Sequence, residues 1–246
     1  MIRYKLFSIY LKNSNTRLNY LFVNRQHPQP SQRSEKTRNR LLRSTESIFA
    51  SLGFGGLTMR EVARRSQTNL ASAHYHFGSK EAMVLEMLKS RVQPINLRRM
   101  KCLEEARALA DGKPLTTEQI LRALILPIGE EIAKSAHSRQ TLAQLVARSF
   151  TEPANFIERM HRKFFGELCE TFMQELRRTH PNAKDEDLYW NLHLAISSML
   201  GALAQHRRLK DFSKGICDEE DTQNMIERLI TFATHGLEAG ISQPSA

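Results

Sequence analysis

The fold prediction depends most on one stretch of the chain, TMREVARRSQTNLASAHYHFGSK, which runs from residue 58 to residue 80. Thr58 and Glu61 have the spacing of a capping box, so they predict the start of a short helix. Asn69 can cap a second short helix, which is predicted to end near Phe77. The Ser-Gln-Thr sequence between the two helices predicts a tight turn. Two short helices joined in this way form a helix-turn-helix arrangement.

The chain upstream of this stretch divides into a helix and a segment without periodicity. A helix is predicted over residues 35–52, ended by Gly53, because five residues fall on one face with the 3.6-residue period. These residues are Leu41, Thr45, Ile48, Phe49 and Leu52. Residues 1–34 show no sustained period and end in a polar, proline-containing stretch. They are therefore predicted to be a disordered tail or sequence upstream of the true start codon.

Downstream of residue 80, long segments with a helical period are separated by Pro and Gly. A helix capped by Ser79 is predicted to end near Arg91, and later helices are predicted near residues 94–110, 117–134, 138–150, 153–179, 185–208 and 219–238. Because alternating β-branched runs do not occur, the predicted fold class is all-α. The predicted domains are residues 1–34 for the tail, 35–80 for a three-helix helix-turn-helix domain and 81–246 for a larger helical domain.

The charge is distributed unevenly along the chain. Residues 1–90 carry 15 Lys and Arg against 5 Asp and Glu, whereas residues 91–246 carry 21 of each, so the net charge of +10 lies in the first part. Concentrated positive charge favours docking to a polyanion, either nucleic acid or an anionic membrane surface. The apolar runs are shorter than a membrane-spanning helix needs, and no signal peptide is predicted. Three widely spaced cysteines fit a reducing cytoplasm.

The second short helix of the motif is predicted to have an inner and an outer side. Ala73 and Phe77 pack inward in this interpretation. The outer side then presents Leu70, Ser72, His74 and Tyr75. Hydroxyl and imidazole groups can hydrogen-bond base edges in the major groove of DNA, and an apolar side chain can contact a thymine methyl group. Thr58, Tyr75 and Lys80 lie at helix ends, where hydroxyls and ammonium groups meet phosphates.

Three segments of this region resemble the signature of the tetracycline-repressor (TetR) family: Thr58-Met-Arg-Glu-Val-Ala63, Ala71-Ser-Ala-His-Tyr-His-Phe77 and Gly78-Ser-Lys80. The preceding helix, with Ile48-Phe49-Ala50 and Gly53-Phe54, is similar to the family pattern as well. The chain departs from that pattern at Gln67, Thr68 and His74, which affects base preference rather than the fold.

This resemblance implies a cytoplasmic, homodimeric transcriptional repressor that binds a near-palindromic double-stranded DNA operator. It implies that Arg60 and the residues from Ser72 to Tyr75 meet DNA and that Lys80 binds a phosphate. The full set of predicted DNA-binding residues is Thr58, Arg60, Asn69, Leu70, Ala71, Ser72, His74, Tyr75, His76 and Lys80. The helices near 185–208 and 219–238 are predicted to form the dimer interface, with the two recognition helices about 34–36 Å apart.

Residues 69–80 and 91–99 further resemble the subgroup of regulators that respond to long-chain fatty acids or their acyl-CoA esters. That resemblance implies release of the repressor by a small hydrophobic or acyl effector bound between the C-terminal helices. Aromatic and Met residues of those helices are mainly core, and some are candidates for ligand contact. The candidates are Phe150, Met160, Phe164, Phe172, Trp190 and Met199.

Other functional classes remain open at this point. A helix-turn-helix regulator controlled by a protein partner, without a small ligand, has the same N-terminal sequence features. A peripheral membrane protein would use the basic N-terminal part. An enzyme is not predicted, because no Ser, Cys or carboxylate stands at a recognisable nucleophile spacing. No cofactor is predicted, and no metal site, because the side chains of His74 and His76 diverge on a short helix.

Overall fold

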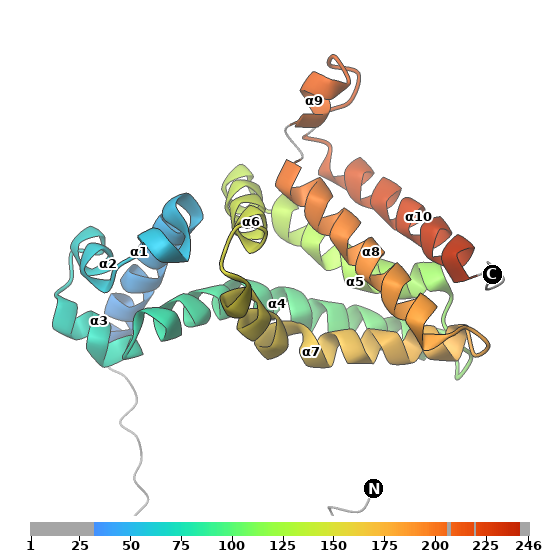
Figure 1. Cartoon of the computed structure of the whole chain (residues 1–246), viewed down its shortest axis with the longest axis horizontal. Helices are drawn as coiled ribbons and strands as arrows, with labels where there is room; N and C mark the ends of the chain where they lie inside the picture. Colours follow the sequence, from blue (N-terminus) through green and yellow to red (C-terminus); the bar gives the residue numbers. More distant parts are fainter. Residues whose placement is uncertain (1–31, 206–207, 219, 242–246) are drawn as a thin grey trace, which may run out of the picture. The chain divides into compact units, whose positions relative to one another are not determined.

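The computed structural model describes residues 32–205, 208–218 and 220–241. Within these ranges every regular element is helical, which confirms the all-α prediction (Figure 1). The helices are α1 (Gln32–Gly56), α2 (Met59–Arg65), α3 (Leu70–Phe77), α4 (Lys80–Leu109), α5 (Thr117–Ala133), α6 (Ala136–Ser149), α7 (Ala154–Thr179), α8 (Asp185–Gln205), α9 (Arg208–Phe212) and α10 (Thr222–Ile241).

The chain separates into two units, Met1–Glu35 and Lys36–Ala246. In the first unit the structure describes only residues 32–35, which form the start of α1. The prediction of a tail over residues 1–34 therefore lies almost entirely outside the described residues. Everything that follows concerns the second unit.

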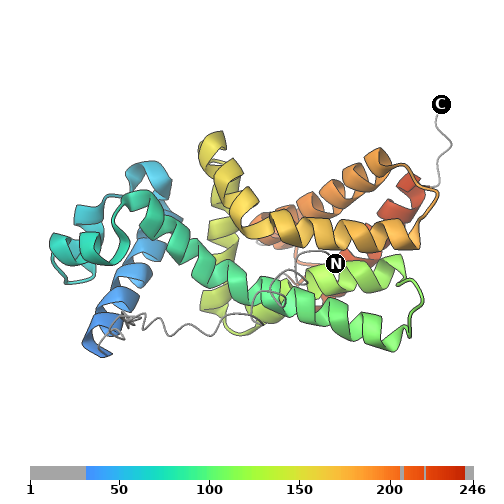
Figure 2. The ribbon, with the colours of Figure 1, turned by 90° about the horizontal axis from the view of Figure 1, so that it is seen from below.

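Two apolar clusters hold the second unit together. The first, here called the head core, joins α1, α2, α3 and the start of α4 with one buried residue each from α6 and α7, and it includes Leu41, Phe49, Val62, Ala73 and Met83. The second, here called the C-terminal core, joins the later part of α4 with α5, α7, α8 and α10. Within it, α5 packs against α4 and α10, and α7 lies along α4 (Figures 1 and 2).

Helix α4 is one continuous helix, which corrects the prediction of a boundary between residues 91 and 94. Proline in a helix interior removes one backbone hydrogen bond and usually kinks or ends the helix. Here Pro94 is exposed, while Met87 and Leu88 before it are buried in the head core and Ile95 and Leu103 after it in the C-terminal core. Burial of apolar side chains on both sides of the proline outweighs the lost bond.

The helix starts follow the caps that the sequence predicts. The side chain of Thr58 accepts a bond from Glu61 N (3.2 Å), and that of Asn69 accepts one from Ser72 N (2.6 Å). Ser79 caps α4 in the same way through Ala82 N (3.1 Å). The capping box at Thr116 is complete, whereas Glu61 does not bond back to the backbone of Thr58, because its carboxylate binds arginines instead.

Three details differ from the predictions for the helices. Gly53 interrupts α1 with a left-handed φ of 70°, but helical structure resumes beyond it to Gly56. Leu52, predicted to be buried, is exposed, because the α1 stripe that reaches the head core ends at Phe49. Helix α9 was not predicted, and it extends past the ends of α8 and α10 (Figure 1).

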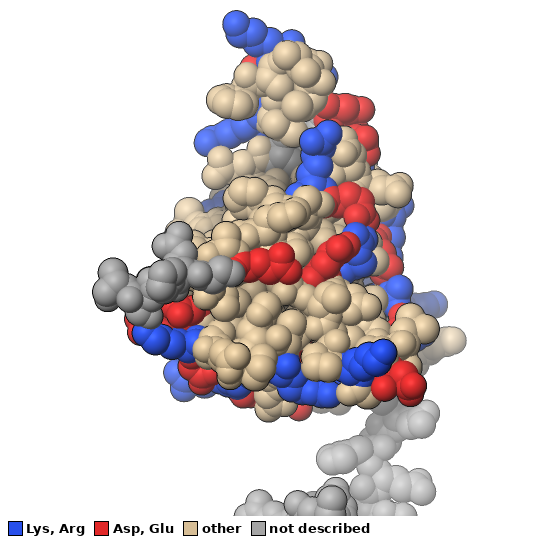
Figure 3. Space-filling model, turned by 90° about the vertical axis from the view of Figure 1, so that its right-hand side faces the viewer, with Lys and Arg blue, Asp and Glu red and all other residues tan. Residues whose placement is uncertain are grey.

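On the face of the molecule shown in Figure 3, basic and acidic residues are interspersed.

Candidate nucleic-acid interface

The turn between α2 and α3 is held by contacts that the local sequence does not reveal. Gln67 adopts a left-handed backbone conformation (φ 52°), which costs an L residue about 1–2 kcal/mol. The backbone N–H of Thr68 donates to the carbonyl of Ala63 (2.9 Å). From α1, the Arg40 guanidinium donates to the carbonyls of Ser66 and Gln67. These bonds offset the strain and fix the angle at which α3 leaves α2.

Helix α3 has a packed side and an exposed side, as predicted from its sequence. Ala73 is 0% exposed in the head core, whereas Tyr75 is 83% exposed. Ala71 and His74 are exposed beside Tyr75, and Leu70 is half-buried. The exposed side therefore presents an aromatic hydroxyl, an imidazole and small apolar groups, which together suit the edges of base pairs in a major groove.

His76 lies on the less exposed part of α3. Its ring contacts Tyr75 edge-on, with centroids 5.3 Å apart. Partial burial, together with the positive charge of Arg38, lowers the pKa of His76 below its ordinary value. Both effects favour the neutral imidazole, which can act as a hydrogen-bond donor or acceptor.

The three arginines of α2 have different partners. Arg64 and Arg65 both bind the carboxylate of Glu61, at 2.7 Å and 3.2 Å. Hydrogen bonding from Arg64 is the main cause that lowers the pKa of Glu61 to about 2. Arg60 is exposed and forms no ion pair within the described part of the chain. Of these three, Arg60 is the cation available to a partner at neutral pH.

Lys80 has a structural contact that the sequence did not predict. Its ammonium group donates to the carbonyl of Phe54 (2.9 Å) and lies 4.2 Å from the centroid of the Phe54 ring. The side chain thus ties the first residue of α4 to the segment that follows Gly53. An ammonium group has three donors, so this bond leaves capacity for a phosphate.

The α6–α7 junction, here called the elbow, contacts the same segment of α1. Both carboxylate oxygens of Glu152 accept the backbone N–H of Phe54 (3.1 Å each), and Arg148 donates to the carbonyls of Ala50 and Ser51. An apolar contact lies beside these polar bonds: the ring of Phe156, near the start of α7, stacks on that of Phe54 with ring centroids 4.8 Å apart. The elbow therefore joins the C-terminal helices to the helix-turn-helix region, here called the head, through polar and apolar contacts.

Two family models match this chain in the regions just described. The model of bacterial regulatory proteins of the tetR family matches residues 41–87, and that of the tetracyclin repressor-like C-terminal domain matches residues 122–236. Together they cover about two thirds of the chain. This chain belongs to the TetR family. It is a DNA-binding transcriptional regulator with a helix-turn-helix head. No curated protein matches it.

Solved structures of other regulators share the fold. NalD, the secondary repressor of the MexAB-OprM multidrug efflux pump in Pseudomonas aeruginosa, is 19% identical with a TM-score of 0.57, covering 80% of this chain and 96% of NalD. A transcriptional regulator from Rhodococcus sp. Rha1 is 16% identical with a TM-score of 0.53, covering 81% and 96%. HlyIIR, a hemolysin II transcriptional regulator, is 16% identical with a TM-score of 0.51, covering 82% and 98%.

The six side chains predicted to contact a ligand do not line one common site in this chain. Phe172 and Met199 are buried in the C-terminal core, and Met160 and Phe164 pack against the head core. Phe150 at the end of α6 is 62% exposed. Trp190 on α8 is 60% exposed. The sequence identified apolar side chains of the right type but not the helix faces on which they lie.

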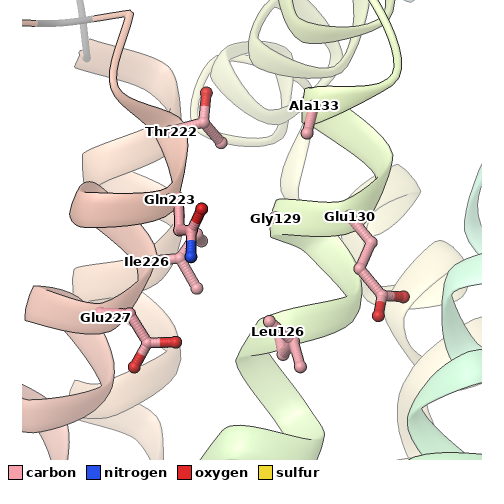
Figure 4. Close-up of a pocket in the computed structure, with 8 residues that line it drawn as sticks. All are labelled: Leu126, Gly129, Glu130, Ala133, Thr222, Gln223, Ile226 and Glu227. Carbon is pink, nitrogen blue, oxygen red and sulfur yellow. The ribbon is translucent and has the colours of Figure 1, made fainter.

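A shallow apolar groove lies between α5 and α10 of the regulator (Figure 4). Its volume is about 220 Å³, which is below the roughly 300–1,000 Å³ of typical small-molecule sites. The groove is lined by Leu126, Gly129, Glu130, Ala133, Thr222, Gln223, Ile226 and Glu227. None of the six predicted ligand residues is among them.

In the part of the chain that the structure describes, no three His, Cys, Asp or Glu side chains are grouped so that they could hold a metal ion. Among the described helices, none combines the length and apolarity that crossing a bilayer requires.

Proposed function

We propose that this regulator is a repressor that binds a near-palindromic operator through the exposed side of α3 and the start of α2. The observation that carries the proposal is the contrast along α3, where Ala73 is locked in the head core while His74 and Tyr75 are open to solvent. Arg60, near the start of α2, is exposed and forms no ion pair with the described residues. A rigid helix with one free side and a basic surrounding suits insertion into a major groove.

The proposed assembly is a homodimer formed through α8 and α10. Trp190 and Leu194, one turn apart on α8, are exposed in the single chain, as is Phe232 on α10. Large apolar side chains that are exposed on a surface favour burial against another surface. A second copy of the chain is the proposed partner, because a two-fold axis places two recognition helices in successive major grooves, about 34–36 Å apart.

The proposed signal is a small hydrophobic or acyl effector that lowers operator affinity. The resemblance of residues 69–80 and 91–99 to acyl-responsive regulators supports this assignment. The elbow supports it as well, because Glu152 and Arg148 connect the C-terminal helices directly to the end of α1. Coupling of this kind is reciprocal and typically amounts to about 1–3 kcal/mol.

Control by a protein partner without a small ligand is the second candidate. The observation that favours it is the close packing of the C-terminal core, in which Phe172 and Met199 are buried. The volume of the α5–α10 groove, about 220 Å³, favours it too. Under this candidate, purified protein would bind its operator equally well with and without a panel of acyl compounds.

Selection of duplexes from a random pool by the full-length chain tests the DNA-binding proposal. We expect enrichment of a near-palindromic site and a steep loss of affinity with salt. The logarithm of the binding constant should fall against the logarithm of the salt concentration with a slope of roughly 0.9 for each phosphate neutralised. An unselective pool with a flat salt response would contradict the proposal.

Arg60→Ala is expected to relax base preference at one position of each half-site. A good contact to a base edge contributes about 1–3 kcal/mol of discrimination, whereas a phosphate contact contributes none. Lys89→Ala is the matched control, because it removes one exposed positive charge from α4. Selection repeated with each variant measures the effect. An unchanged motif for Arg60→Ala would show that Arg60 does not contact bases.

A further inference from the structure

Arg99 is a buried guanidinium that no carboxylate of the described residues pairs with. It lies on α4 and is 3% exposed. Its hydrogen bonds go to neutral groups: Nε donates to the carbonyl of Leu124 (2.8 Å), Nη1 to Oδ1 of Asn96 (3.0 Å), and Nη2 lies 3.9 Å from the sulfur of Met199. Among the described residues, no Asp or Glu forms an ion pair with it. By contrast, the buried carboxylate of Glu175 on α7 is paired with Arg107 (2.8 Å), so the charge of Arg99 requires an explanation.

Part of the explanation is structural. The Nε–H of Arg99 donates to the carbonyl of Leu124 and so ties α4 to α5. A neutral hydrogen-bond donor would serve this purpose equally well. The contact therefore explains the position of the Nε–H group, but it does not explain why a charged side chain is buried here.

The charge persists at neutral pH. Burial lowers the pKa of Arg99 to about 10, which still leaves the guanidinium protonated at pH 7. An isolated buried charge is strongly unfavourable unless an opposite charge or several hydrogen bonds compensate it. Nη2 has the weakest compensation, because a thioether sulfur is a poor acceptor.

We propose that Arg99 binds the carboxylate of a small apolar effector, which takes the place of the Met199 thioether at Nη2. This assignment rests on the proposed effector control and narrows it to one chemical class, the free acid. A carboxylate offers two oxygens to a guanidinium and supplies the missing negative charge. An acyl-CoA thioester would place a neutral carbonyl at the same point and leave the charge uncompensated.

The surroundings of Arg99 can yield to such a ligand. Met199 is unbranched and adapts its conformation readily, so its thioether can leave the guanidinium while the chain stays packed. The apolar side chains of the C-terminal core then surround the ligand's hydrocarbon part. The filled core is the ligand-free arrangement, and the site opens as the acid enters.

Arg99 is also connected to the head. Asn96 accepts from Nη1 of Arg99 and donates through its Nδ2 to the carbonyl of Phe164 on α7 (2.8 Å). The Phe164 side chain in turn packs against the head core. A carboxylate bound at Nη2 that shifts the guanidinium would also shift Asn96 and thus loosen a contact between α4 and α7 that reaches the head.

Calorimetric titration of the full chain with octanoate, dodecanoate and hexadecanoate, each beside its matched primary alcohol, tests the assignment. We expect at least one acid to bind tenfold or more tightly than its alcohol and than its CoA thioester. Arg99→Met should abolish this preference. Lys101→Met is the control, because it removes an exposed positive charge from the same helix and should keep the preference. Arg99→Lys retains the positive charge but lacks the planar guanidinium that can donate two parallel hydrogen bonds to a carboxylate. It should bind the acid at least threefold more weakly than the unchanged protein does.

Each outcome decides the assignment. No acid preferred over its alcohol, or a preference that survives in Arg99→Met, would overturn it. If Arg99→Met does not fold, unchanged binding by Arg99→Lys would overturn it equally. Selection of operator duplexes without ligand tests the proposed function separately, because Arg99 lies in the C-terminal core and not among the residues proposed to contact DNA. Folded Arg99→Met should keep its operator and lose only release by the acid.

Discussion

At the scale of single residues, the elbow shows how one side chain can belong to two parts of the chain. Phe156 begins α7, yet its ring is fully buried in the head core, stacked on Phe54 and 6.2 Å from Phe49. Phe150, six residues earlier, is exposed at the end of α6. Of the two phenylalanines that flank this junction, Phe156 is therefore buried and Phe150 is exposed.

Phe156→Ala is expected to reduce the free energy of unfolding by about 3–5 kcal/mol, because it removes a buried ring and leaves a cavity. Phe150→Ala should change it by less than about 0.5 kcal/mol, as for other surface positions. Urea denaturation of both variants measures the difference. Equal losses would mean that the head core does not depend on the ring from α7.

At the scale of elements, the contact between α1 and the elbow depends on the backbone at Gly53. Its φ of 70° and ψ of −173° lie in a region that is essentially restricted to glycine. A Cβ at this position would also overlap the carboxylate of Glu152. Both the conformation and the close approach therefore require a residue without a side chain.

Gly53→Ala is expected to destabilise the protein by about 1–3 kcal/mol through backbone strain, with a further loss from the displaced Glu152 side chain. Gly55→Ala is the matched control, since no atom lies within 4 Å of its added Cβ and its φ is ordinary. In the double variant with Glu152→Ala, part of the Gly53→Ala loss should disappear. Thermal unfolding of the four variants tests this, and additive losses would exclude a clash with Glu152.

The sequence predicted those elements whose signals are local. Thr58, Asn69 and Ser79 cap the helices that they were expected to cap, because a cap bonds to a backbone group only three residues away. The contacts of Lys80 with Phe54 were not predictable, since they join residues 26 positions apart. The continuity of α4 through Pro94 was missed for the same reason, because packing on both sides decides it.

The candidate site was predicted in composition but not in all its contacts. The exposed side of α3 followed from its period, with Ala73 inward and Tyr75 outward. The anchoring of the turn by Arg40 and the burial of Arg99 arise from tertiary packing and leave no local pattern. For the same reason, the predicted ligand residues are scattered over two cores and the surface.

At the scale of the whole molecule, the proposed dimer makes a direct prediction. Phe232→Glu on α10 should shift the chain from dimer to monomer in light scattering and weaken operator binding at least tenfold, because a charge cannot be buried in the interface without a partner. Leu109→Glu is the control, since Leu109 is also a large apolar residue that is exposed but lies at the end of α4. A dimer that tolerates Phe232→Glu would place the interface elsewhere.

Helix α4 has a consequence for the construction of hybrid regulators. It runs from Lys80 to Leu109 without a break and carries Met87 in the head core and Leu103 in the C-terminal core. One residue inserted between them would turn one core by about 100° relative to the other and shift it by 1.5 Å, from the pitch of an α-helix. Seven residues would restore the rotation to within about 20°, but not the distance. A biosensor that combines the head of one relative with the effector region of another therefore has to be spliced within α4, residue for residue.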